Sequence, residues 1–293
     1  MSSTSRTRML LFVTVLFALC GGPVFFSSTL FWSSTAPAEE TPLAGKSSPL
    51  AAVTLADLAA GKVRVVDMTW TLDETAPSWP AEAAPKFQLT TYSTLEKNGV
   101  LSKAISMPEH FGTHLDAPNH FSARPIAVDQ LTPDQLIGPG VVLDLTLKAE
   151  ADPDAMLTEE DLAKWEQQHG PIPAGAIVFL KTGWARHWTQ PVRYRNQDAR
   201  GQMHFPGYSE AATRWLIEHR KIRGIGIDTL SIDPGASRDF PVHRLLNGAG
   251  RYGLENVAAL DQLPARDFAV IVSPLKLKNG SGGPTRLYAL LAK

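Results

Sequence analysis

The chain has 293 residues, of which 44% are hydrophobic and 19% charged, so it is long enough for one large domain or two small ones with a substantial core. Its formal net charge of -1 and the lack of any Lys/Arg tract argue against nucleic acid as the main partner. The single cysteine, Cys20, excludes a disulfide framework and a cysteine-based zinc site. Any chemistry must therefore come from His, Asp, Glu and backbone groups.

Residues 1–38 have the pattern of a signal peptide. The apolar stretch Met9–Cys20 has the length of a signal-peptide core and is too short to span a bilayer, and small residues at 36–38 suit signal peptidase. The alternative is an uncleaved anchor, because residues 9–32 are uncharged and long enough to cross a membrane with tilt. We expect a periplasmic or secreted protein, with no stable membrane partner unless this segment is retained.

Residues 39–53, rich in Ala, Pro, Ser and Thr, are predicted to be a linker, and residues 54–293 a single domain. A short helix is expected at Thr54–Ala60, and two longer ones start at Thr158 and Ser209. The expected strands are Val63–Thr69, Val141–Leu147, Ala176–Thr182, Arg223–Asp228, Phe268–Ser273 and Arg286–Leu291. Strands that alternate with helices, with unpaired strands near both ends, predict an α/β domain with a mixed β-sheet flanked by helices.

Three of the eight histidines fall within the eleven residues HFGTHLDAPNH, which start at His110 and end at His120. In an extended chain His110, His114 and Asp116 would point to one face, and two imidazoles with a carboxylate favour Zn²⁺ or Mn²⁺ over Ca²⁺. Four residues of straight strand span about 13 Å, too far for two ligands of one ion, so the chain has to bend. Gly112 is the position where a bend costs least.

The alternative is that the three histidines serve separate structural roles, as a single histidine usually does. Three histidines and an aspartate at this spacing, in a chain with few histidines, favour a shared site instead. Four other histidines have ordinary helix or loop settings and are expected to be structural: His169, His187, His204 and His219.

The segment resembles the H-x-G-T-H-x-D-x-P-x-H signature of the cyclase family, metal-dependent hydrolases that include bacterial kynurenine formamidases and isatin hydrolases. Further likenesses run through roughly residues 63–291, and include Trp79-Pro80, Lys181-Thr182-Gly183-Trp184, Gly226-Ile227-Asp228 and Gly283-Pro284-Thr285-Arg286. The resemblance implies the family's swivelling β/β/α-like fold and a homo-oligomer, often a dimer.

The resemblance also implies roles for individual residues. His110, His114 and Asp116 would be metal ligands, joined by a His and a Glu twelve positions apart, which His243 and Glu255 match. His120 would be the proton-transfer residue and Trp79 would line the substrate pocket. One or two ions, Zn²⁺ or Mn²⁺, are compatible with this ligand set.

The expected reaction is hydrolysis of the C–N bond of a small aromatic amide or lactam by metal-activated water, with His120 as general base. N-formyl-L-kynurenine is the first candidate substrate and isatin the second. Phe111, Phe121 and Trp184 could extend an aromatic wall around it. Two alternatives are an exported protein that binds metal and an aromatic ligand without turnover, and a lactone hydrolase or cyclase that uses the same site.

Overall fold

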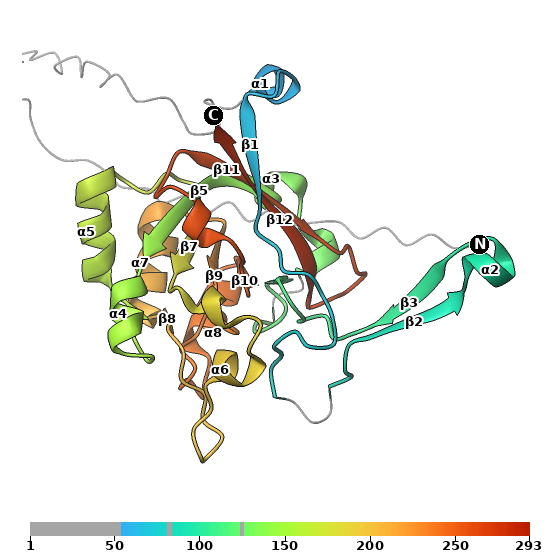
Figure 1. The fold of residues 1–293 in the computed structure, drawn as a ribbon. Helices are drawn as coiled ribbons and strands as arrows, with labels where there is room; N and C mark the ends of the chain where they lie inside the picture. The colour runs from blue at the N-terminus through green and yellow to red at the C-terminus, as the bar shows by residue number, and fades with distance from the viewer. Residues whose placement is uncertain (1–53, 81–83, 124–125) are drawn as a thin grey trace, which may run out of the picture. The chain divides into compact units, whose positions relative to one another are not determined.

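Hydroxyl side chains start the predicted helices in the computed structural model, which describes residues 54–80, 84–123 and 126–293 (Figure 1). The side chains of Thr54, Thr158 and Ser209 each accept a hydrogen bond from a backbone N–H of the first turn that follows. The helices are α1 (Leu55–Ala59), α2 (Leu95–Asn98), α3 (Pro133–Leu136), α4 (Thr146–Ala151), α5 (Glu159–His169), α6 (Pro191–Arg195), α7 (Glu210–Arg220) and α8 (Pro241–Gly248). No helix of these described ranges has the length and apolar character needed to cross a bilayer.

Eight strands form one mixed sheet, in the order β1-β12-β11-β5-β7-β9-β10-β4. They are β1 (Val63–Asp67), β4 (His114–Asp116), β5 (Ile137–Asp144), β7 (Ile177–Lys181), β9 (Gly224–Ile227), β10 (Tyr252–Glu255), β11 (Phe268–Pro274) and β12 (Gly282–Ala292). The central strands β5, β7, β9 and β10 are parallel, and the others pair antiparallel. This combination of parallel and antiparallel pairs confirms the predicted mixed sheet. Because β4 pairs with both β10 and β12, the sheet also closes on itself like a barrel.

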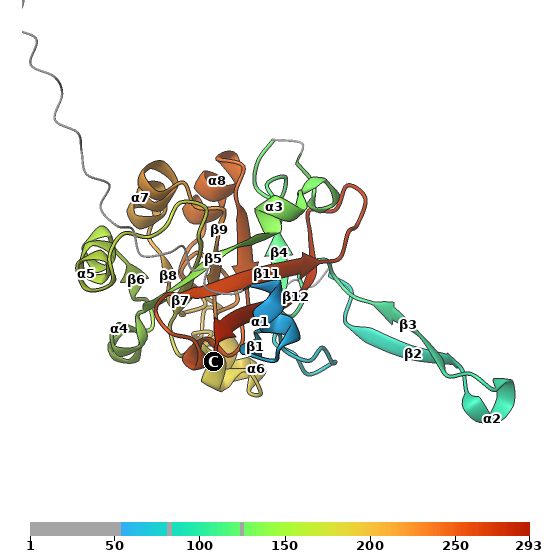
Figure 2. The ribbon, with the colours of Figure 1, turned by 90° about the horizontal axis from the view of Figure 1, so that it is seen from above.

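Both faces of the central strands β7 and β9 are buried. Along β7, Ile177 and Phe179 point into the barrel interior, while Val178 and Leu180 point outward under the helices. The outer face is covered by α5, α7 and α8, which lie along one side of the sheet in Figures 1 and 2. Burial on two faces explains the continuous apolar runs of the central parallel strands.

The strand and helix predictions hold to within a few residues, with one shift and several omissions. The strand expected at Val141–Leu147 begins earlier, at Ile137, and ends at Asp144, because Thr146 already starts α4. Sequence analysis missed α8, the short strands β4 and β10, the pair β6 (Met156–Leu157) and β8 (Gly207–Tyr208), and the hairpin β2 (Gln88–Ser93) and β3 (Ser102–Ser106). The predicted signal peptide at 1–38 and linker at 39–53 lie outside the described residues and stay predictions.

Close packing inside the barrel gives a stability prediction at Gly140 on β5. A Cβ added there would lie 2.0 Å from Cε2 of the buried Phe268, so we expect Gly140→Ala to lower the free energy of unfolding by about 1–3 kcal/mol. The control is Gly248→Ala at the end of α8, where a Cβ meets nothing within 4 Å and where alanine favours a helix. Urea unfolding measures both; equal stabilities of the two variants would contradict the packing described here.

Candidate metal centre and active site

Four side chains from three segments, β4, β10 and α8, meet at one end of the closed sheet. His114 and Asp116 lie on β4, and Glu255 ends β10 directly opposite His114 in the antiparallel register. His243 comes from α8, which lies in the crossover between the parallel strands β9 and β10. All four are buried, so ionised carboxylates and imidazoles share a space from which water is largely excluded.

A sharp bend at Gly112 brings His110 back toward the same point. Gly112 has a φ of 64°, and a Cβ there would lie 2.1 Å from Cδ2 of Leu72. The bend places Nδ1 of His110 2.5 Å from Oδ1 of Asp116. The structure thus has the turn that the spacing of the motif requires, at the expected residue.

The distances within the cluster are short enough for one ion to replace the direct contacts. Nε2 of His114 lies 3.3 Å from Oδ1 of Asp116 and 3.4 Å from Oε2 of Glu255. Nε2 of His243 lies 3.3 Å from Oδ2 of Asp116 and 3.1 Å from Oε1 of Glu255. Two groups of donor atoms lie within 4.8 Å of one another, His114–Asp116–Glu255 and His110–Asp116–His120.

Hydrogen bonds on the outer side of each ring orient the buried imidazoles for metal binding. Nδ1 of His114 lies 2.9 Å from the carbonyl of Gly112, and Nδ1 of His243 lies 2.6 Å from Oδ2 of Asp233. Each Nδ1–H donates outward, so that Nε2 of each ring faces the carboxylates and is the nitrogen that can ligate a metal ion. Nε2 of His114 is buried and makes no hydrogen bond of its own among the described residues. Such a nitrogen, beside two carboxylates, suits a divalent ion of the zinc or manganese type.

Asp233 has the geometry of a residue that positions His243. Its carboxylate is fully buried and also accepts hydrogen bonds from the backbone N–H groups of Val242 and His243, at 2.9 and 3.0 Å. We therefore expect Asp233→Asn to weaken divalent-metal affinity about 10–100-fold, as loss of an outer partner of a ligating histidine typically does. Isothermal titration with Mn²⁺ measures the effect. Asp261→Asn, at an exposed aspartate, is the control, and an unchanged affinity in Asp233→Asn would contradict the assigned role.

The cluster stabilises positive charge. Burial by itself disfavours the charged form of His114, but Asp116 and Glu255 outweigh it and raise the pKa to about 10. Burial likewise opposes ionisation of Asp116, yet His114 and His110 hold the pKa of this carboxyl well below its usual range. The carboxylates thus remain ionised, and their negative charge has to be balanced by a cation. Either protonated imidazoles or a divalent ion can provide that positive charge.

His120 lies beside the cluster and faces the cavity above it. Its ring stacks on His110 with centroids 3.9 Å apart, and the centroid of His243 is 5.9 Å away. Burial, the largest cause, lowers the pKa of His120 to about 4, so the ring is neutral near pH 7 and can accept a proton. Because its nitrogen also falls within the second donor group, the geometry suits a proton acceptor and a metal ligand alike.

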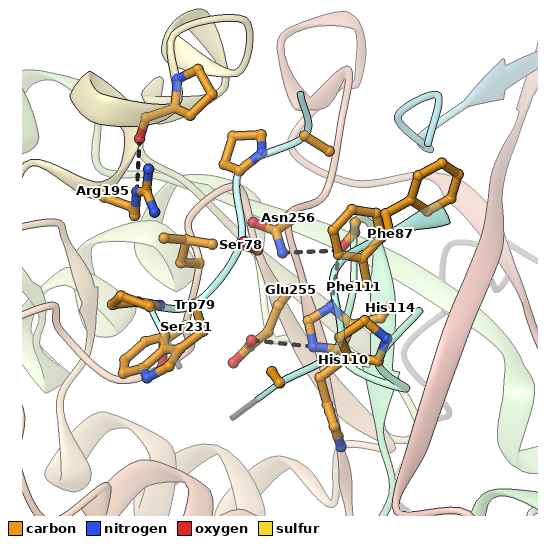
Figure 3. Close-up of a pocket in the computed structure, with 18 of the residues that line it drawn as sticks. Ser78, Trp79, Phe87, His110, Phe111, His114, Arg195, Ser231, Glu255 and Asn256 are labelled. Carbon is orange, nitrogen blue, oxygen red and sulfur yellow. Dashed lines mark hydrogen bonds and ion pairs between the residues drawn. The ribbon is translucent and has the colours of Figure 1, made fainter. Parts of the chain in front are cut away.

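A cavity of about 980 Å³ opens above the cluster. Figure 3 shows Glu255 and His114 directed toward each other, with the Trp79 ring on one side of them and the Phe111 ring on the other. The aromatic residues that line the cavity are Trp79, Phe87, Phe111, Phe121 and Phe240. Flat apolar walls above a polar, charged floor are suited to a small aromatic ligand with a reactive polar group.

The structure brings together every residue singled out in the sequence: His110, His114, Asp116, His120, His243, Glu255 and Trp79 all lie at the cluster or in the cavity wall. One accessory expectation is wrong. Trp184 does not line the cavity. It is buried in a separate, largely aromatic cluster, where its Nε1–H donates to the carbonyl of Tyr194 and its ring packs with apolar neighbours.

Sequence reasoning missed residues that shape the site without belonging to a motif. Asn256 donates from Nδ2 to the carbonyl of Gly112, 2.9 Å away, and its own carbonyl accepts from the hydroxyl of Thr113. These bonds fix the bend between His110 and His114. Phe240 adds an aromatic wall beside Trp79, with ring centroids 5.7 Å apart. A lone Asn or Phe gives no signal of such a role in one sequence.

A closed mixed sheet with a buried His/Asp/Glu cluster under an aromatic cavity defines a candidate metal-dependent hydrolase, and comparisons with known proteins agree. The "Putative cyclase" family model matches residues 66–234. The isatin hydrolase of Roseibium aggregatum is 34% identical over 253 residues, which cover 81% of this chain and 95% of that protein. A kynurenine formamidase of Geobacillus thermodenitrificans is 28% identical and covers 75% of this chain and 94% of that one.

Solved structures show the same relation. Isatin hydrolase A from Labrenzia aggregata, bound to benzyl benzoate, superimposes with a TM-score of 0.77 at 39% identity over 82% of this chain and 98% of that one. Isatin hydrolase A from Ralstonia solanacearum gives a TM-score of 0.77 at 35% identity, covering 89% of this chain and all of that one. The chain belongs to the cyclase family, and it has that family's fold.

Proposed function

We propose that this protein hydrolyses the C–N bond of a small aromatic lactam or amide, with a lactam of the isatin type as first candidate and N-formyl-L-kynurenine as second. This order reverses the one expected from the sequence, because the isatin hydrolases are more similar to the chain than the kynurenine formamidase is. The observation that carries the proposal is the buried cluster of His114, His243, Asp116 and Glu255 at the floor of the aromatic cavity.

The cavity positions the substrate. A planar ring packs between the apolar walls formed by Trp79 and Phe111, which leaves its carbonyl directed at the floor. His110, His114, Asp116, His243 and Glu255 would hold a divalent ion. When bound, the ion would supply Lewis acidity and lower the pKa of a water molecule that contacts it. Asp233 and the Gly112 carbonyl keep the two buried imidazoles in the tautomer that binding requires.

His120 moves the proton in this proposal. It takes a proton from the attacking water as a C–O bond forms at the carbonyl carbon, and it returns a proton to the nitrogen as the C–N bond breaks. The products are a carboxylate and an arylamine. One water is consumed and one proton is released to solvent, so atoms and charge balance. The sequence has no Gly-x-Ser-x-Gly elbow, and its single cysteine, Cys20, lies in the predicted signal peptide, so the usual nucleophiles of an acyl-enzyme route are missing.

The protein is expressed from the full chain and loaded separately with Zn²⁺ and Mn²⁺. Hydrolysis of isatin and of N-formyl-L-kynurenine is then measured from the change in their ultraviolet absorbance. We expect turnover of isatin to exceed that of the formamide, and turnover of both to need metal. Inactivity on both substrates with metal confirmed bound would reject the proposal and support a protein that binds metal and an aromatic ligand without turnover. Hydrolysis confined to an aryl lactone would support the lactone-hydrolase alternative.

A further inference from the structure

The ring of His110 is held at both of its nitrogens. Nδ1 faces the cluster, 2.5 Å from Oδ1 of Asp116, and Nε2 lies 2.9 Å from Oγ of Ser281, the residue directly before β12. His114 and His243 are oriented the other way, with Nδ1 bonded outward and Nε2 facing the carboxylates. His110 therefore presents the opposite nitrogen to the cluster from the other two histidines.

A carboxylate beyond Ser281 fixes the direction of this contact. The Ser281 hydroxyl donates to Oε2 of Glu109, 2.7 Å away, and the backbone N–H of Ser281 donates to the same oxygen at 2.8 Å. The hydroxyl has only one proton, so toward His110 it can act only as an acceptor. In a neutral imidazole the one ring proton then has to lie on Nε2, which leaves the lone pair of Nδ1 directed at the cluster.

The backbone around Ser281 holds the hydroxyl in place. The carbonyl of Ser281 accepts from the N–H of Ala117, directly after β4, at 2.8 Å. A Cβ added at Gly282 would lie 2.6 Å from Cε1 of His110, so the chain packs closely against the ring at this point. The hydroxyl and the ring that it faces are therefore fixed by the same pairing of β4 with β12.

We propose that Ser281 and Glu109 are positioning residues of the metal centre. They keep the proton of the His110 ring on Nε2, so that this histidine ligates through Nδ1, whereas His114 and His243 ligate through Nε2. Neither Ser281 nor Glu109 lines the cavity, so both act through His110, as the outer partner of a ligating histidine does. The inference rests on the metal centre of the proposed function, but not on the choice of substrate.

The first test measures Mn²⁺ affinity by isothermal titration in Ser281→Ala, Glu109→Gln and the double variant. We expect Ser281→Ala to weaken binding about 10–100-fold, because the ring loses the acceptor that fixes its proton. Glu109→Gln should cause a smaller loss, since an amide oxygen still accepts from the hydroxyl but carries no charge. Because Glu109 acts through Ser281, the double variant should bind no more weakly than Ser281→Ala alone.

Asp129→Ala is the matched control. Oδ1 of Asp129 accepts from the backbone N–H of Asn279 in the same loop, 3.0 Å away, so this change weakens the anchoring of the loop but keeps the Ser281 hydroxyl. The control should bind Mn²⁺ as the wild type does, and circular dichroism confirms that all variants are folded. A wild-type affinity in Ser281→Ala, or an equal loss in Asp129→Ala, would overturn the proposal.

A second measurement reports on the ring itself. In protein with isotope-labelled histidine and bound Zn²⁺, nitrogen NMR distinguishes the protonated nitrogen of each ring from the one that ligates. We expect one ring that ligates through Nδ1 and carries its proton on Nε2, and its N–H signal should shift or exchange faster in Ser281→Ala but not in Asp129→Ala. Ligation of every zinc-bound ring through Nε2, or an Nδ1-ligated ring that does not respond to Ser281→Ala, would overturn the proposal.

Turnover measured on the same samples separates this inference from the proposed function. Metal affinity that depends on Ser281, without hydrolysis of isatin or N-formyl-L-kynurenine, would reject the proposed function and leave the positioning role standing. Metal-dependent turnover with an affinity that does not depend on Ser281 would support the function and reject the role. A wild type that binds neither Mn²⁺ nor Zn²⁺ would overturn both.

Discussion

Asp116→Asn is expected to abolish metal binding and turnover together while the protein stays folded. The carboxylate of Asp116 faces three imidazoles at once, those of His110, His114 and His243, and no other side chain of the cluster does so. An amide of the same shape keeps one acceptor but loses the charge. We expect the metal affinity to fall by more than the ~10–100-fold that loss of an outer partner causes, with a matching loss of kcat/KM.

Metal content by plasma mass spectrometry, paired with kcat/KM, measures this effect. The matched control is Asp144→Asn at the end of β5, where the carboxylate pairs with Lys181 at 2.5 Å and is about half exposed. A partly exposed pair of this kind contributes at most about 1 kcal/mol, so the control should retain metal and activity. A variant at Asp116 that retains full metal content would show that the cluster is not the metal site.

His120→Ala is expected to separate catalysis from metal binding. If His120 transfers the proton, its loss lowers kcat by about 10²–10⁴-fold while the metal content stays at the wild-type level, because the other five donors remain. The stack between His120 and His110 makes a small change in metal affinity compatible with this role.

Metal content and kcat of His120→Ala are compared with those of His219→Ala, whose exposed ring on α7 contacts the carbonyl and the ring of Trp215. The control should behave as the wild type. Loss of metal together with activity in His120→Ala would identify His120 as a ligand, as its membership of the second donor group also allows, and would remove it as the base.

The local parts of the site are readable from the sequence because one short segment encodes them. The alternation of His110, His114 and Asp116 and the need for a bend at Gly112 follow from strand geometry alone, and the structure has both. The alternating pattern of helices and strands likewise predicts the mixed sheet, since both-face burial leaves continuous apolar runs.

The distant parts of the site depend on tertiary pairing, which local patterns do not encode. Glu255 meets His114 only because β10 and β4 pair antiparallel. Without a family resemblance, an isolated Glu in a sequence is interpreted as an exposed surface residue. β4 itself is three residues long and is fixed by its two neighbours rather than by its own composition. Asp233 and Asn256 act through hydrogen bonds to residues that are distant in the sequence, so no local spacing predicts their roles.

In the proposed function, the buried His/Asp/Glu cluster holds a divalent metal that the hydrolysis of an aromatic lactam needs. The most direct measurement strips the protein with a chelator, restores Mn²⁺ or Zn²⁺ in steps, and follows isatin hydrolysis and bound metal in the same samples. We predict no turnover in the stripped protein and a rate that rises in proportion to bound metal. Turnover that is the same with and without metal would contradict the account.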